Sequence, residues 1–404
     1  MEVKSVVDRA VAGEDLDEQE VTFLLGLRGP DLNAAAAAAD ALRKEQVGDV
    51  VTYVVNRNIN FTNACILRCK FCAFSRNYRS SEAFMLPIEE VVRRAEEAWN
   101  LGATEVCIQA GLAPGMDWRL YPKILEQIKA RVPNMHIHAY SPEEIWYGSR
   151  LSGMNYSDFL RTLMGAGLDS MPGTSAEILD DSIRKIISPG RLPVNEWVKI
   201  IKAAHSLGIP TTATMMYGHV ENLAQRAEHL LLLRDIQKET GGFTEFVPLS
   251  FVPYRTELNS SGVVKWAPTA FETVAIYVAA RLALGWHIKN LQVSWVKEGP
   301  RLAQAILAAG ANDFGGTLIN ESISTSAGSS HGQFMNPREI RRLILDAGRV
   351  PAQRSTTYKI IKHFTEVEDG NPIPLEGAVY SEEKFGSFNE LIADKKFRFS
   401  RRSP

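Results

Sequence analysis

The stretch VTYVVNRNINFTNACILRCKFCAFSR, residues 51–76, joins two different sequence patterns. Its first twelve residues are rich in β-branched and aromatic side chains, which predicts a β-strand. Its second half places Cys65, Cys69 and Cys72 in a C-x3-C-x2-C array, although the whole chain holds only four cysteines. Three clustered thiols directly after a strand indicate a metal centre rather than a disulfide framework.

Seven further short apolar or β-branched runs follow, and segments of helical periodicity separate them. One such helix is expected over residues 88–101, where apolar side chains recur on one face. Eight strand and helix units predict a (β/α)8 TIM-type barrel, in which chemistry occurs at the C-terminal ends of the strands. The seven runs are EVCIQAG (105–111), HIHAYS (136–141), DSMPGTS (169–175), TTATMMYG (211–218), TEFVPLSF (244–251), LQVSWV (291–296) and ANDFGGT (311–317).

The segments that flank the barrel differ from it in composition. Residues 1–50 include the alanine-rich DLNAAAAAADALRKEQ, which predicts an N-terminal helical extension. Residues 51–363 form the expected barrel, and residues 364–404 show little periodicity, which is typical of an irregular C-terminal tail.

Charge and hydropathy exclude several classes of protein. The formal net charge of −2 gives no basic field for nucleic acid or for an anionic membrane surface. The first twenty residues lack the apolar run of a secretory signal, and no window approaches the roughly 18 apolar residues that span a bilayer. We therefore expect a cytoplasmic protein that binds neither nucleic acid nor membrane.

The number of clustered thiols limits the kind of metal centre. A structural zinc ion is usually held by four protein ligands, whereas an iron-sulfur cluster held by three cysteines leaves one iron open to a small molecule. The remaining cysteine, Cys107, lies in an apolar run and is expected to pack there. Two alternatives remain at this point, an open cluster or a zinc site that a histidine completes.

The cysteine array, with Phe71 before its last cysteine and a barrel strand before its first, resembles that of radical S-adenosylmethionine enzymes. The resemblance implies that Cys65, Cys69 and Cys72 hold a 4Fe-4S cluster whose open iron binds S-adenosylmethionine. It also implies a 5′-deoxyadenosyl radical and an external reductant such as ferredoxin or flavodoxin.

The same resemblance suggests contacts to the nucleotide. Phe71 corresponds to an aromatic residue beside the adenine, and Gln109 to Gly111 stand where the family has a Gly-Gly-Glu turn, from which Gln109 departs. Carboxylates near helix starts also complement the helix dipole, which is the alternative for both acids in this set. The implied cofactor contacts are Phe71, Gln109, Gly111, Glu177, Gly218 and Glu221.

Six longer phrases resemble CofH, the enzyme of deazaflavin (FO, the coenzyme F420 precursor) biosynthesis, over roughly residues 45–365. The resemblance implies transfer of the 4-hydroxybenzyl group of L-tyrosine to 5-amino-6-(D-ribitylamino)uracil after cleavage of the tyrosine Cα–Cβ bond, and a CofG-type companion enzyme. The alternative is a menaquinone-pathway relative, aminofutalosine synthase or dehypoxanthine futalosine cyclase. The phrases are NINFTNACILRCKFCAF, MHIHAYSPEEI, SMPGTSAEILDD, GIPTTATMMYGH, GGFTEFVPLSF and NDFGGTLINESIS.

Polar residues in or after the predicted strands are candidates for substrate contacts. His136, His138 and Tyr140 alternate, so we expect them to share one face. Glu245 is a costly charge to bury without a partner, and we assign catalytic roles to Glu245, His138 and His219. The alternative to a substrate-binding role is structural: the histidines would be hydrogen-bonded residues of the core, and the polar residues after the strands would belong to solvated loops. The candidate substrate contacts are Asn60, His136, His138, Tyr140, His219, Glu245, Glu321 and Ser322.

Overall fold

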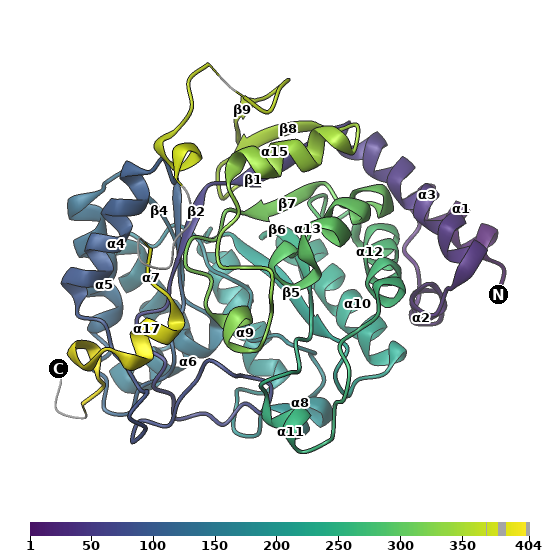
Figure 1. Cartoon of the computed structure of the whole chain (residues 1–404). Helices are drawn as coiled ribbons and strands as arrows, with labels where there is room; N and C mark the ends of the chain where they lie inside the picture. Colours follow the sequence, from purple (N-terminus) through teal and green to yellow (C-terminus); the bar gives the residue numbers. More distant parts are fainter. Residues whose placement is uncertain (369, 379–384, 401–404) are drawn as a thin grey trace.

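The fold is a parallel β-barrel surrounded by helices, as Figure 1 shows. It is seen in a computed structural model that describes residues 1–368, 370–378 and 385–400. The first predicted strand is divided into β1 (Val50–Val54) and β2 (Asn56–Ile59). β1 pairs with β7 (Asp313–Gly316), and β2 pairs with β3 (Glu105–Ile108). β1 and β2 together therefore occupy the first strand position of the barrel, between the last position and the second.

The other strands close the ring in chain order, all in parallel. β3 pairs with β4 (His136–Ala139), and β5 (Thr211–Tyr217) pairs with β6 (Phe243–Ser250). Two predicted strands are reduced to short bridged segments: residues 170–171 lie between β4 and β5, and residues 291–292 between β6 and β7. The predicted (β/α)8 barrel is confirmed, because eight parallel segments follow one another around the ring.

Helices cover the outside of the barrel, and local sequence explains where several begin. Ser141 and Glu144 form a capping box with a proline at the first helical position, which starts a helix that periodicity had not indicated. No helix among the described residues has the length and apolar character needed to cross a membrane. The helices between residues 88 and 346 are α4 (Ile88–Asn100), α5 (Leu120–Arg131), α6 (Pro142–Ser152), α7 (Tyr156–Ala166), α8 (Asp181–Ile187), α9 (Val194–Ser206), α10 (Leu223–Thr240), α11 (Glu257–Ser260), α12 (Ala270–Leu284), α13 (Trp295–Ile306), α14 (Ile323–Ser326) and α15 (Pro337–Asp346).

The N-terminal region contributes three helices, α1 (Val3–Val11), α2 (Glu18–Leu25) and α3 (Gly29–Val47). They pack on α10 and α12, on one side of the barrel (Figure 1). The indole nitrogen of Trp286 donates to the Ala10 carbonyl at 2.9 Å, which ties α1 to the end of α12. The predicted helical extension is therefore present as a layer outside the barrel helices.

The C-terminal region holds elements that periodicity did not predict. β8 (Val350–Arg354) pairs in parallel with β1, and β9 (Ile360–His363) returns antiparallel to β8. Beyond it lie η2 (Pro374–Gly377), α17 (Phe388–Ala393) and η3 (Lys395–Phe397), whose apolar side chains Leu375, Phe388 and Phe397 are buried. Of the segment expected to be irregular, residues 369, 379–384 and 401–404 lie outside the described residues.

The β8–β9 connection fills the N-terminal end of the barrel with a charged network. Arg354 donates to Asp313 at 3.0 Å and to Glu245 at 3.4 Å, and Tyr358 donates to Glu245. Thr356 donates to Glu105, the first residue of β3, at 2.7 Å. All of these residues except the half-buried Tyr358 are buried, and each carboxylate has a partner from the protein. The end of the barrel opposite the cysteine loop is thus sealed by paired charges.

Replacing Arg354 by methionine tests this seal. Loss of the guanidinium leaves Asp313 and Glu245 as close buried carboxylates without a cation, which costs about 3–5 kcal/mol of unfolding free energy. Arg342→Met is the matched control, because Arg342 is exposed and pairs only with Glu339 on its own helix, so its expected change is within about 0.5 kcal/mol. Urea unfolding followed by circular dichroism measures both. Equal stability of the two variants would contradict the structural role of Arg354.

Candidate active site

A cavity of about 390 Å³ opens at the C-terminal ends of the strands, where the cysteine loop follows β2. All three clustered cysteines line it, together with residues that follow most of the other strands. Most of its wall is apolar, with Leu67, Leu112, Leu249 and Phe251 among the lining residues. This position is where a TIM-type barrel carries its chemistry.

Backbone hydrogen bonds hold the cysteine loop in a fixed position. The Cys65 amide donates to the Arg76 carbonyl at 3.0 Å, and the Arg76 amide donates to the Asn63 carbonyl at 2.8 Å. The Cys65 sulfur accepts from the amides of Leu67 and Leu112, both at 3.4 Å. Amide donors directed at a sulfur stabilise a thiolate and tune an iron-sulfur centre.

The donor set fits a cluster. Cys65, Cys69 and Cys72 are free thiols, and burial raises the pKa of Cys65 and of Cys69, so a metal centre replaces their protons when it binds. Among the described residues, no three His, Cys, Asp or Glu side chains are arranged to hold one metal ion. A 4Fe-4S cluster does not require the three sulfurs to converge on one ion, because each cysteine binds a different iron.

Gly111 fixes the distance between the second strand position and the cysteine loop. Its amide donates to the Thr62 carbonyl at 2.9 Å. A Cβ atom at this position would lie 2.4 Å from the Ala64 carbonyl oxygen, next to Cys65. Glycine is therefore needed here because the backbone of one segment touches the backbone of the other.

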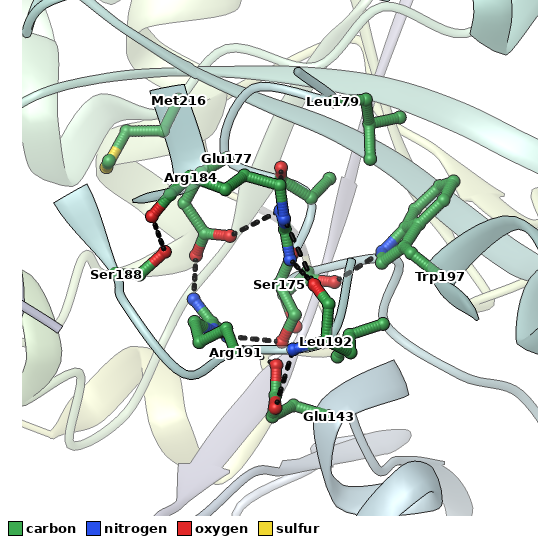
Figure 2. Close-up of polar contacts among 12 residues, drawn as sticks. Glu143, Ser175, Glu177, Leu179, Arg184, Ser188, Arg191, Leu192, Trp197 and Met216 are labelled. Atoms are coloured by element: carbon green, nitrogen blue, oxygen red, sulfur yellow. Dashed lines mark hydrogen bonds and ion pairs between the residues drawn. The ribbon is translucent and has the colours of Figure 1, made fainter. Parts of the chain in front are cut away.

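Arg191 connects the acidic residues on one side of the cavity, as Figure 2 shows. It donates to Glu177 at 2.6 Å, to Glu143 at 3.0 Å and to the Ser175 hydroxyl at 2.6 Å. Its guanidinium also lies 5.6 Å from the centre of the Phe71 ring. This network places Glu177 and Phe71 on the same part of the wall as the cysteines.

The turn that carries Glu177 is strained and firmly held. Ser175 and Glu177 have φ values of 63° and 40°, a backbone conformation that residues other than glycine rarely adopt. The buried Arg184 donates to the carbonyls of Ser175 and Ala176, at 3.1 and 2.8 Å. Glu177 Oε2 is buried and has no hydrogen-bond partner among the described residues. A bound molecule that supplies a donor would satisfy this oxygen.

Several predicted site residues line the cavity. Gln109 accepts from the Thr174 hydroxyl at 2.9 Å through its side chain and from Asn60 at 2.8 Å through its carbonyl. The predicted residues in the cavity wall are Asn60, Cys65, Cys69, Phe71, Cys72, Gln109, Gly111, Glu177 and Glu321.

Two predicted histidines and one tyrosine lie elsewhere. His136 and His138 both contact the Ser170 hydroxyl at 2.7 Å, and neither lines the cavity that the described residues form. Burial lowers the pKa of His138 to about 4 and also lowers the pKa of the half-buried His136, so His138 is a neutral core histidine. Tyr140 follows the end of β4, and its hydroxyl donates to the Tyr121 carbonyl of α5 at 2.9 Å. The expected shared face does not extend to Tyr140, because alternation ends with the strand.

The residues predicted after β5 form a support behind the cavity. Glu221 accepts from the amides of Gly218 and His219 and from Arg226. The His219 ring packs edge-on against Phe251, which lines the cavity. Gly218, His219 and Glu221 themselves are absent from the cavity wall that the described residues form.

Glu245 and Ser322 also differ from expectation. Glu245 is the third residue of an eight-residue strand, so it lies toward the closed end, where Arg354 and Tyr358 contact it. The Ser322 hydroxyl donates to the Asn320 carbonyl at 3.0 Å and faces a small neighbouring cleft. Neither residue belongs to the described wall of the main cavity.

Two cationic residues of the wall, Arg191 and Lys297, were not among the predicted residues. Arg191 lies in a loop between α8 and α9, and no local pattern marks it. Lys297 directly follows the run LQVSWV, and a polar residue just after a barrel strand is the signal that could have identified it.

Comparison with known proteins agrees with this geometry. Residues 59–233 match the radical SAM superfamily, and residues 240–367 match the CofH/MqnC C-terminal region. A 5-amino-6-(D-ribitylamino)uracil–L-tyrosine 4-hydroxyphenyl transferase of Archaeoglobus fulgidus is 51% identical over 80% of this chain and 92% of its own. The chain belongs to this transferase family within the radical SAM superfamily. A Methanothermobacter thermautotrophicus enzyme of the same name is 45% identical over 89% of this chain and 98% of its own.

The fold has solved counterparts in the superfamily. The FeFe-hydrogenase maturase HydG from Carboxydothermus hydrogenoformans superposes with a TM-score of 0.67 at 16% identity, covering 88% of this chain and 80% of that chain. At this identity the likeness concerns the fold alone. Radical SAM proteins use a 4Fe-4S cluster and S-adenosylmethionine, so the expected cofactors are those of the family to which this chain belongs.

Replacing Cys65, Cys69 or Cys72 by alanine is expected to prevent cluster assembly, because each substitution removes a ligand of one iron. Anaerobic reconstitution followed by iron and acid-labile sulfide analysis measures the result, which should fall to background. Cys107→Ala is the matched control, since Cys107 is absent from the described cavity wall and should leave wild-type iron content. Loss of iron in Cys107→Ala alone would show that the assigned ligand set is wrong.

Proposed function

We propose that this chain transfers the 4-hydroxybenzyl group of L-tyrosine to 5-amino-6-(D-ribitylamino)uracil, as the names of its relatives indicate. The observation that carries the proposal is the presence of three cysteines in the wall of one apolar cavity, in a chain that matches these transferases over most of its length. The tyrosine amine loses a hydrogen atom, which ends in 5′-deoxyadenosine, and the Cα–Cβ bond breaks. The glycine part leaves as iminoacetate, and the benzylic carbon forms a bond to C5 of the uracil.

The cofactors occupy the side of the cavity that carries the cysteines. Cys65, Cys69 and Cys72 hold the 4Fe-4S cluster. When bound, the cluster and S-adenosylmethionine supply a 5′-deoxyadenosyl radical, and a reductant such as ferredoxin or flavodoxin supplies the electron. Phe71, Gln109, Gly111 and Glu177 contact the nucleotide, and Glu177 Oε2, which lacks a hydrogen bond within the described residues, accepts from one of its donors.

The barrel itself contributes confinement. A carbon radical reacts with any accessible C–H bond, so a productive site must exclude other reactants and hold the two substrates in contact. The paired charges around Arg354 serve the first requirement, because they close the barrel below the cavity and leave the strand ends as the approach. The single cavity at the strand ends serves the second, because both substrates would share it.

A menaquinone-pathway reaction on a futalosine-type substrate is the second candidate. One observation favours keeping it: the profile that matches residues 240–367 describes CofH and MqnC proteins together. The curated relatives at 45–51% identity carry the tyrosine transferase name, which supports the first candidate.

The product of this reaction still lacks a closed ring system. We propose that a CofG-type radical enzyme consumes it, because the chain has one C-x3-C-x2-C array and therefore one cluster to initiate one radical reaction.

An anaerobic assay tests the function. The reconstituted enzyme, S-adenosylmethionine and dithionite are incubated with tyrosine and the ribitylaminouracil, and mass spectrometry follows the products. We expect the hydroxybenzyl adduct and 5′-deoxyadenosine in equal amounts, and no adduct when tyrosine is replaced by phenylalanine. Formation of 5′-deoxyadenosine only with a futalosine-type substrate would establish the second candidate instead.

A further inference from the structure

The wall of the cavity contains two cationic side chains among the described residues, and they differ in their partners. Each of the three side-chain nitrogens of Arg191 donates one hydrogen bond, to Glu143, Glu177 or Ser175. The ammonium of Lys297, at the start of α13, makes no hydrogen bond or ion pair with any described residue, and the residue is half-buried in the cavity wall. An ammonium is a triple donor, so a ligand anion in the cavity can complete it.

An unpaired carboxylate oxygen lies in the same part of the cavity. Glu321 is 6% exposed, and its Oε1 accepts from the Ser324 amide at 2.9 Å. Its Oε2 is buried and has no partner within the described parts of the chain. Glu321 and Lys297 follow neighbouring positions of the ring, residues 313–316 and 291–292, whose bridge joins Gln292 to Asp313.

The two charges influence each other without forming a direct ion pair. Burial lowers the pKa of Lys297 and raises the pKa of Glu321, and each charge partly offsets the effect on the other. The separation leaves a positive and a negative group facing one cavity, each with free hydrogen-bonding capacity. A zwitterion with adjacent anionic and cationic groups matches this arrangement.

We propose that Lys297 and Glu321 bind the head group of the amino-acid substrate, with the ammonium of Lys297 on the α-carboxylate and Glu321 Oε2 on the α-amino group. This inference rests on the proposed function, because it takes tyrosine as the amino acid. It identifies the residues that hold the atoms next to the bond that breaks, and it accounts for both unpaired groups with one ligand.

S-adenosylmethionine also carries an amino-acid head group, and the position of the pair distinguishes the two sources. The cysteines follow the first strand position, and Glu177 and Arg191 follow the fourth. Arg191, which donates to Glu177, lies 5.6 Å from the ring of Phe71 in the cysteine loop, so these residues share the cofactor side of the cavity. Lys297 and Glu321, at positions seven and eight, lie across the ring from position four, and we assign them to the second amino acid in the cavity.

Equilibrium binding to the cluster-loaded, unreduced enzyme tests the assignment. Anaerobic calorimetry compares L-tyrosine with tyramine, which lacks the carboxylate, and with 3-(4-hydroxyphenyl)propionate, which lacks the amine. Charge-assisted hydrogen bonds predict that the wild type prefers tyrosine to each analogue by about ten- to a hundredfold. The Lys297→Met variant should lose the preference for tyrosine over tyramine. The Glu321→Gln variant should lose the preference for tyrosine over 3-(4-hydroxyphenyl)propionate.

Control measurements exclude a general effect. Lys199→Met removes an exposed lysine of α9 and should preserve all wild-type preferences. The affinity for S-adenosylmethionine should be unchanged in both site variants, with wild-type iron content and circular dichroism. If Lys297→Met fails to fold, Glu321→Gln with the propionate tests the pair by itself.

Two results would overturn the proposal: a wild-type preference for tyrosine over tyramine that persists in Lys297→Met, or a loss of affinity for S-adenosylmethionine in place of tyrosine. Failure of the proposed function is recognised separately, because the wild type would then form no hydroxybenzyl adduct in the product assay, whatever the binding preferences are.

Discussion

The position of three sulfur atoms depends on the hydrogen bonds that fix residues 63–76 to the end of the first strand position. The bonds between Cys65 and Arg76 and between Arg76 and Asn63 close the base of this loop, and the Leu112 amide holds the Cys65 sulfur against the neighbouring segment. Gly111 permits this contact because its backbone touches that of Ala64. The parallel ring is thus the support that brings a short cysteine array to one wall of a cavity.

Charges inside the barrel divide into two groups. At the closed end, Arg354, Asp313, Glu245 and Glu105 all have partners from the protein, so that region is complete without a ligand. At the open end, Glu177 Oε2 and Glu321 Oε2 accept no hydrogen bond from the described residues, although Arg184 lies 3.9 Å from the first, and the Lys297 ammonium has no partner there. These three groups share one cavity, so ligand groups inside it can supply the missing hydrogen bonds.

The sequence predicted the barrel and the position of the cysteine loop after its first strand, because these features depend on local periodicity and on a short motif. Prediction was poorer for residues whose role depends on depth along the barrel axis. Strand periodicity identifies which face Glu245 and His138 occupy, yet their distance from the mouth follows from strand register, which only the pairing of β3, β4 and β6 determines. Arg191 lies in a loop without periodicity, and its importance appears only when Glu143 and Glu177 meet it in space.

The central claim is that the three cysteines leave one iron of the cluster free to bind S-adenosylmethionine inside this cavity. Electron paramagnetic resonance of the reduced cluster, with methionyl groups labelled with ¹⁵N and ¹⁷O, tests it directly. The account predicts that the nucleotide changes the cluster signal and that hyperfine coupling to both labels appears. A signal that is unchanged by the nucleotide, with no coupling to either label, would contradict it.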